Sequence, residues 1–325
     1  MTSRKLTQMF LALAALVVLA MSALAADPGT PIPDASAVSD QKAGSVLIYN
    51  LYSSSSTNPV AQNTRINITN TDDRDGVFVH LFFVDGNTCS VADSYICLSK
   101  SQTTSFLASD IDPDVTGYIV AVAVGADGCP IKWNKLIGDE YVKATNIVGA
   151  NLGAEAISAI AAPACDANSV FATLKFDGAA YNELPRVLAI DNVASAKDGN
   201  ETFLVVNRIS GSLIDGAFSI GSIFGILFDE LESGHSFTFA GGCQLRATLS
   251  DSFPRTTPRY TSVVPAGSTG WLKFWATSDR ALLGAVFNKN AQASATSFNG
   301  AHNLHKLTTT TAGSYTIPVF TAMCN

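Results

Sequence analysis

The strongest constraint on the fold is a strand pattern that occurs twice. Residues 116–126 read TGYIVAVAVGA, and residues 269–279 read TGWLKFWATSD. Both segments begin with Thr-Gly-aromatic and continue as an apolar or alternating run, which is typical of a strand within a sheet. One such pattern in each half of the chain predicts a mainly β protein built in two parts.

Short apolar or alternating runs separated by turn residues support this prediction in both halves. In the first half they predict strands at 46–52, 65–69, 78–86, 103–109, 117–125 and 130–138. In the second half they predict strands at 187–193, 202–209, 222–230 and 235–241, and two more within 271–288. Between the halves, the Ala-rich stretch from Ala154 to Ala161 predicts a short helix that Pro163 ends.

The N-terminus has the features of an export signal. Arg4 and Lys5 precede an apolar run, and Ala23-Leu24-Ala25 provides a small-residue cleavage site. We therefore expect a signal peptide at 1–25 and a flexible leader at 26–43. Two β-sandwich domains then follow, at 44–166 and 167–325, with no membrane span in the mature chain.

The turn before the first copy of the repeated strand carries a fold-level resemblance. Residues 114–118 read Asp-Val-Thr-Gly-Tyr, which resembles the tyrosine corner of immunoglobulin-like sandwiches. In the second copy Trp271 replaces the tyrosine. The chain is thus similar to tandem immunoglobulin-like modules of uncharacterised exported bacterial proteins. The resemblance implies two antiparallel sandwiches in which the Tyr118 phenol bonds back across its own corner, and it brings no catalytic residues.

All six cysteines follow the predicted signal peptide, and an even number in an exported chain indicates disulfides. Sequence alone leaves many pairings open. Neighbourhood along the chain favours Cys89 with Cys97, Cys129 with Cys165, and Cys243 with Cys324.

Composition narrows the class of function. The formal net charge is −7 and only 14% of residues are charged, which argues against nucleic acid as a partner. The sequence contains no Gly-x-Ser-x-Gly, no His-Glu-x-x-His and no P-loop. These features favour a secreted or cell-surface, non-enzymatic structural, adhesive or binding module, whose partner is an extracellular protein or a glycan.

Two sets of side chains are candidates for binding a ligand. Trp271 and Trp275 share one face of a predicted strand, and an exposed pair would form a platform for sugar rings, although such residues usually lie in a core. Arg255 and Arg259 form a basic patch in a proline-spaced loop and are candidates for contacting an anionic partner.

A loop near residue 230 is the candidate site for a metal or a reaction. Asp229, Glu230 and Glu232 could bind calcium or serve a hydrolase, although a solvated hairpin tip is the simpler interpretation. No other cofactor is expected. His302 and His305 could share one face of a turn, but two imidazoles without a third ligand rarely form a metal site.

Overall fold

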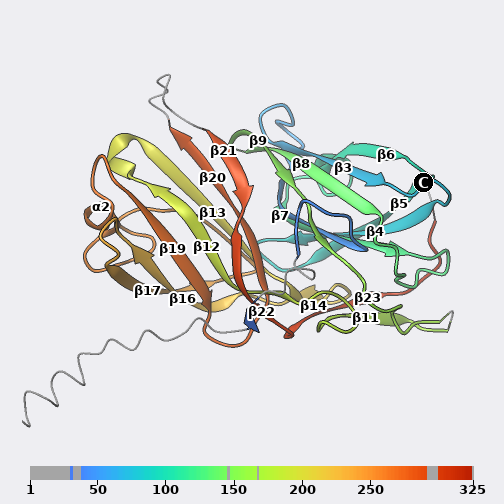
Figure 1. Ribbon diagram of the computed structural model, residues 1–325. Helices are drawn as coiled ribbons and strands as arrows, with labels where there is room; N and C mark the ends of the chain where they lie inside the picture. The colour runs from blue at the N-terminus through green and yellow to red at the C-terminus, as the bar shows by residue number, and fades with distance from the viewer. Residues whose placement is uncertain (1–29, 32–37, 145–146, 167, 291–298, 324–325) are drawn as a thin grey trace, which may run out of the picture.

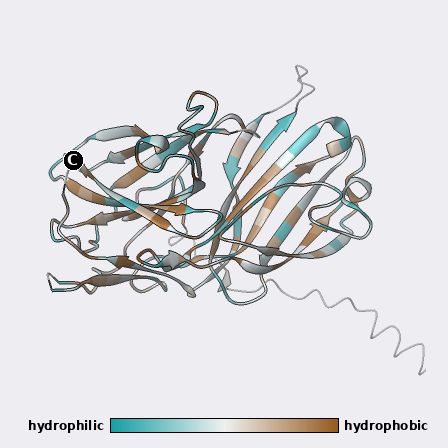
Figure 2. Cartoon of the chain, turned by 180° about the vertical axis from the view of Figure 1, so that it is seen from behind, coloured by the Kyte–Doolittle hydropathy of each residue, from teal (hydrophilic) through white to brown (hydrophobic). Residues whose placement is uncertain are grey.

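The computed structural model describes residues 30–31, 38–144, 147–166, 168–290 and 299–323. Within this part the protein is mainly β, as the alternating patterns predict, and hydrophobic and hydrophilic residues alternate along many strands (Figure 2). The predicted signal peptide lies outside the described residues, as does most of the leader. No helix in the described part is long and apolar enough to cross a membrane.

Strands from the first half build two of the five sheets. Sheet 1 has the order β10-β2-β7-β4-β5 and sheet 2 the order β6-β3-β8-β9. Their bounds are β2 Val46–Ser53, β3 Asn63–Asn70, β4 Val77–Asp85, β5 Val91–Leu98, β6 Thr103–Leu107, β7 Thr116–Val124, β8 Leu136–Ala144, β9 Ile147–Gly153 and β10 Glu155–Ile157.

Two further sheets come mostly from the second half. Sheet 3 has the order β1-β22-β12-β19-β16-β17 and sheet 4 the order β18-β13-β20-β21. Their bounds are β1 Thr30–Pro31, β12 Leu184–Ala194, β13 Asn200–Arg208, β16 Gly221–Phe228, β17 Gly234–Gly241, β18 Gln244–Thr248, β19 Thr269–Ala276, β20 Leu282–Asn290, β21 Gly300–Asn303 and β22 His305–Thr310.

Sheet 5 lies beneath sheet 1 and has the order β11-β23-β14-β15 (Figure 1). It is formed by β11 Phe171–Phe176, β14 Ser210–Ser212, β15 Gly216–Ala217 and β23 Gly313–Pro318. Apolar side chains fill the space between the two sheets, among them Val120 from β7, Leu174 from β11 and Ile317 from β23. A second core separates sheets 1 and 2, so sheet 1 is covered on both faces. This explains why β7 is apolar at nearly every position.

Sheets 3 and 4 enclose a core of their own, which includes Ile190, Leu204 and Phe274. A smaller cluster, including Leu51, Val142 and Val205, joins β2 and β8 to sheet 4. The cores are therefore linked, and the described parts of the two halves pack against each other.

The repeated Thr-Gly-aromatic motif begins equivalent strands. The order β2-β7-β4-β5 in sheet 1 matches the order β12-β19-β16-β17 in sheet 3, and the motif begins β7 and β19. A side chain at Gly117 would clash with the carbonyl of Val84, and one at Gly270 would clash with the carbonyl of Phe228. Glycine is thus required at both positions by the close approach of the neighbouring strand, β4 or β16.

The prediction of two tandem immunoglobulin-like sandwiches is wrong. The described strands form five small sheets in place of two sandwiches. Five is also the number of blades in a five-bladed β-propeller. Each sheet nevertheless combines strands from separate parts of the chain, whereas a propeller blade is one repeated unit of four strands. In an immunoglobulin-like sandwich the first strand joins the sheet of the second, and the last pairs with the one before it. Here the first long strand, β2, pairs with β7 in sheet 1, whereas the next strand, β3, lies in sheet 2. Likewise β8 pairs with β3 in sheet 2 and not with the strand before it, β7.

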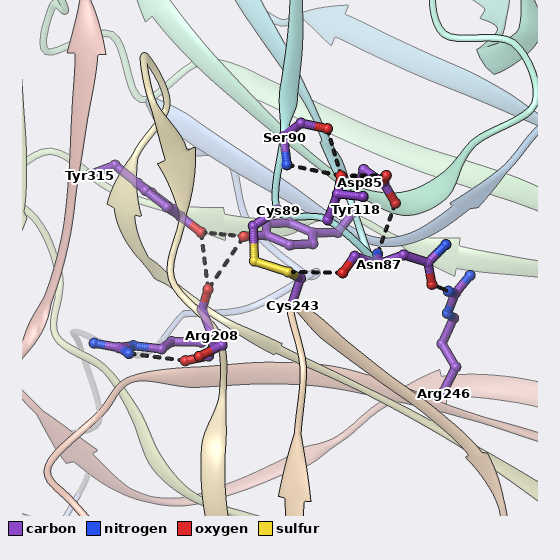
Figure 3. The surroundings of a disulfide bond; sticks show 11 residues. Asp85, Asn87, Cys89, Ser90, Tyr118, Arg208, Cys243, Arg246 and Tyr315 are labelled. Carbon is purple, nitrogen blue, oxygen red and sulfur yellow. Dashed lines mark hydrogen bonds between the residues drawn. A yellow bond between two sulfur atoms is a disulfide. The ribbon is translucent and has the colours of Figure 1, made fainter.

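The tyrosine-corner prediction is wrong for a related reason. Tyr118 is fully buried, and its phenol lies 3.0 Å from the phenol of Tyr315 and 3.4 Å from the carbonyl of Arg208. Tyr315 donates to the same carbonyl at 3.1 Å (Figure 3). Asp114 accepts instead from the hydroxyl and the amide of Ser56. The Tyr118 phenol therefore joins the two halves and does not close its own corner.

The disulfides also connect distant segments. Cys129 bonds to Cys165 as predicted, with their Cα atoms 5.7 Å apart. Cys89 bonds to Cys243 across 154 residues (Figure 3), so the predicted pairings of Cys89 with Cys97 and of Cys243 with Cys324 are both wrong. Cys97 is itself disulfide-bonded, and Cys324 lies outside the described residues. Disulfides fit an oxidising compartment, as expected for an exported chain.

The predicted helical connection is also wrong. Residues 155–157 form β10, an edge strand that pairs with β2, and Glu155 is opposite Ile48. Small alanines fit the tightly packed edge of sheet 1, where Ala154 and Ala156 are buried. Tertiary packing therefore outweighs the helix propensity of alanine. The predicted domain limits at 44–166 and 167–325 stay a prediction.

Candidate functional site

The outer face of sheet 3 carries a row of aromatic side chains. Along β19, Leu272, Phe274 and Ala276 are buried in the core, and the alternate residues Trp271 and Trp275 point to the opposite face. Both tryptophans are partly exposed. The core location that is usual for tryptophan therefore does not apply to this pair.

Each of these tryptophans packs on a phenylalanine from the neighbouring strand β16. Trp271 stacks on Phe228 with ring centroids 4.4 Å apart and an angle of 7° between planes. Trp275 contacts Phe224 at 5.1 Å with the rings tilted by 52°. Strand register causes this pairing, because Phe228 is opposite Trp271 and Phe224 is opposite Trp275. We call these four residues the aromatic face.

The aromatic face has a polar margin. Ser236 and Thr238 on β17 are exposed and lie opposite Ile226 and Phe224, so they belong to the same face of the sheet. The two aromatic pairs are separated by four residues along β19, or about 13 Å. The arrangement offers two apolar contact points beside hydroxyl groups, which suits an extended ligand that has both apolar and polar surfaces.

The two predicted basic residues lie on a separate loop that leads into the short helix α2, Tyr260–Val263. Arg255 is exposed. Arg259 is also exposed, and its guanidinium donates to the carbonyl of Asp251 at 3.0 Å. A role for either residue in binding an anionic partner stays a prediction.

The acidic loop is the turn between β16 and β17. Asp229 accepts from the amides of Leu231 and Ser233, both at 2.9 Å, and these bonds lower the pKa of its carboxyl. Glu230 accepts from the amide of Thr269 at 2.7 Å. Glu232 occupies a left-handed position with φ of 64°. Two of the three carboxylates thus have a structural role in the turn, which does not favour the hydrolase alternative. Calcium binding here stays a prediction.

The structure brings together one set of ligand residues that the sequence did not reveal. His302 and His305 meet Asp191, and one ligand atom from each side chain lies within 4.8 Å of the others. Asp191 belongs to β12, more than 100 residues earlier in the chain. Only the pairing of β12 with β22 places this carboxylate beside the histidines, so their sequence spacing alone gave two ligands without a third.

Comparison with known proteins adds little. No protein-family model matches the chain, and no curated protein matches it. Among solved structures, the apo form of the lectin of Pleurotus ostreatus aligns over 90% of this chain and 88% of that one, at 10% identity with a TM-score of 0.16. Such a low TM-score supports no conclusion about fold or ligand.

Proposed function

We propose that the protein is a non-enzymatic binding module that holds a glycan chain on its aromatic face. The observation that carries this proposal is the outward position of Trp271 and Trp275, each supported by a phenyl ring from β16. Large apolar rings at a solvent-facing surface favour contact with a partner, because covering them removes apolar area from water.

A glycan fits this surface better than a wholly apolar ligand. Sugar rings present C–H groups on their faces and hydroxyls at their edges, so they can contact an indole and a hydrogen-bonding group at once. The hydroxyls of Ser236 and Thr238 lie beside the aromatic pairs and can meet the sugar hydroxyls. Two pairs about 13 Å apart along the strand suit a chain of several sugars more than a single sugar.

The test is binding of the untagged mature chain to a glycan array and to insoluble polysaccharides, followed by affinity measurement on the best ligand. Covering about 60 Å² of indole contributes about 1.5 kcal/mol at about 25 cal/mol per Å². We therefore expect Trp275→Ala and Trp271→Ala each to weaken binding about tenfold.

Phe171→Ala provides a matched control, because Phe171 is an exposed aromatic residue on sheet 5, away from the aromatic face. It should leave glycan affinity unchanged. The proposal fails if no glycan binds, or if the two tryptophan variants bind as tightly as the wild type. Binding of a protein partner through Trp271 and Trp275 in place of a glycan would also overturn it.

A further inference from the structure

Two imidazoles and a carboxylate converge at the junction of β21 and β22. Nε2 of His305 lies 3.4 Å from Oδ2 of Asp191, and Nε2 of His302 lies 3.8 Å from Oδ1 of the same carboxylate. The two imidazole rings are 5.6 Å apart, centre to centre. Asp191 and His305 are exposed and His302 is partly exposed, so solvent and ions can reach all three side chains.

The surrounding strands hold these residues in place. Leu304 lies between the two histidines, is buried, and donates its amide to the carbonyl of Gly284 at 2.9 Å. Because neighbouring side chains in an extended strand point to opposite faces, the buried Leu304 leaves the next residue, His305, on the exposed side. In the adjacent strand β12, Ala189 is opposite His305, and Asp191 follows two residues later. The three ligands thus come from three strands: Asp191 from β12, His302 from the end of β21 and His305 from the start of β22.

Hydrogen bonding prepares one histidine to act as a ligand. Nδ1 of His302 lies 3.0 Å from the backbone carbonyl of Asn303. A proton on Nδ1 donates to that carbonyl and leaves the lone pair of Nε2 directed toward Asp191. The amide side chain of Asn303 is fixed in turn by bonds to Asp40 at 2.9 Å and to the carbonyl of Gly153 at 2.8 Å. Metal-binding histidines are commonly oriented by such second bonds.

We propose that Asp191, His302 and His305 bind a divalent transition metal of the zinc class. A tetrahedral zinc ion with bonds of about 2.1 Å places its ligand atoms about 3.4 Å apart. In this protein one ligand atom from each of the three side chains lies within 4.8 Å of the others, so rotation of the side chains would be needed to bring them to that spacing. Two nitrogen ligands and one carboxylate favour zinc, copper or nickel over calcium and magnesium, which prefer oxygen ligands.

Charges around the site also favour a cation. Asp40 and Asp191 border the same surface hollow as the two histidines. The nearby ammonium of Lys306 is paired with the buried carboxylate of Glu155 at 2.7 Å, which reduces its repulsion of a metal. Three protein ligands leave a fourth position open toward the hollow, where water or a ligand oxygen would complete the coordination.

The test is isothermal titration of zinc into the metal-stripped, untagged mature chain, with cobalt absorption spectra as a second readout of geometry. We expect one equivalent of zinc to bind and cobalt to give an intense visible spectrum. His302→Ala, His305→Ala and Asp191→Asn should each weaken zinc affinity at least tenfold. Calcium and magnesium should not compete.

His235→Ala serves as the control, because His235 lies in the β16–β17 hairpin beside Asp229 and outside this cluster. It should leave zinc binding unchanged, and circular dichroism should show that all variants are folded. The proposal is overturned if no saturable zinc binding occurs, or if the His302 and His305 variants bind zinc as the wild type does. Glycan binding need not change in any of these variants, so this test is independent of the proposed function.

Discussion

Replacing Lys306 by methionine would remove the ammonium that pairs with a buried carboxylate between the two halves. Glu155 on β10 is fully buried, and its Oε2 accepts from Nζ of Lys306 on β22 at 2.7 Å. The other oxygen, Oε1, has no hydrogen-bond partner among the described residues. Methionine has a similar length and fills the same space, so the main effect is electrostatic.

The expected loss of stability is large. Burial raises the pKa of Glu155, and Lys306 opposes that rise. Without the ammonium, the carboxylate must remain charged in an apolar setting or take up a proton. Breaking a buried ion pair by removing one partner costs about 3–5 kcal/mol. We expect the free energy of unfolding of Lys306→Met to fall by about that amount at pH 8.

The loss should depend on pH in a defined direction. The pKa of Glu155 in the folded variant lies above the value of about 4.3 in the unfolded chain. The stability that such a group contributes to the folded protein is fully present below the unfolded pKa and is lost as pH rises through the folded pKa. The difference in the free energy of unfolding between variant and wild type should therefore be small at pH 4.5. It should grow by up to about 1.4 kcal/mol per pH unit once the pH exceeds the folded pKa of Glu155 in the wild type, which burial also raises.

Urea unfolding followed by intrinsic fluorescence, in EDTA and at several pH values, measures this difference. Lys289→Met is the matched control, because its partner Glu201 at 3.1 Å is partly exposed, and the loss should stay below about 1 kcal/mol. Glu155→Gln combined with Lys306→Met should recover much of the stability. The reasoning is refuted if Lys306→Met loses less than 1 kcal/mol at pH 8, or loses the same amount at pH 4.5.

Two other predictions concern the junction shown in Figure 3. Replacing Cys89 and Cys243 together by alanine opens a loop of 154 residues. In the chain-entropy description this should lower the free energy of unfolding by about 5 kcal/mol. Denaturant unfolding under non-reducing conditions measures the loss, and an unchanged midpoint would contradict the prediction. Tyr315→Phe removes the hydroxyl that bonds to Tyr118 and to the carbonyl of Arg208. The free energy of unfolding should fall by about 1–2 kcal/mol. Thermal unfolding measures this loss, and Tyr141→Phe on sheet 2 serves as the comparison.

Local patterns in the sequence were sufficient to predict many of the strands. The run at 46–52 lies within β2, and the run at 117–125 matches β7 except for its last residue, Gly125. Strand β5 was not predicted, because VADSYICL combines polar and apolar residues without clear alternation. It also contains Cys97, which was expected to pair with Cys89 across a short loop. The Ala-rich segment that resembled a helix is a strand, because packing against β2 determines its conformation.

Contacts between distant residues could not be predicted. Tyr118 and Tyr315 are 197 residues apart, and nothing in the local sequence of Tyr118 distinguishes this partner from a carbonyl in its own corner. For the same reason, neighbourhood along the chain gave the correct partner for Cys129 but not for Cys89.

The candidate sites show the same limit. The spacing of Trp271 and Trp275 placed them on one face of their strand. Sheet 4 packs against the opposite face of sheet 3, and this packing, which the sequence does not show, leaves the tryptophans on the outer face. The spacing of His302 and His305 was visible, whereas Asp191 joins them only through strand pairing. Sequence thus identified side chains that share a short segment, and the topology supplied their partners.

The position of β23 in sheet 5 affects how the chain acquires its structure. This strand ends at Pro318, near the C-terminus, yet it pairs with β11 on one side and β14 on the other. Without β23, the strands β11 and β14 lose the neighbour that joins them, and the apolar side chains of β2, β4 and β7 that face sheet 5 are incompletely covered. A chain truncated before Gly313 would therefore be expected to aggregate, even though most of its strands are present.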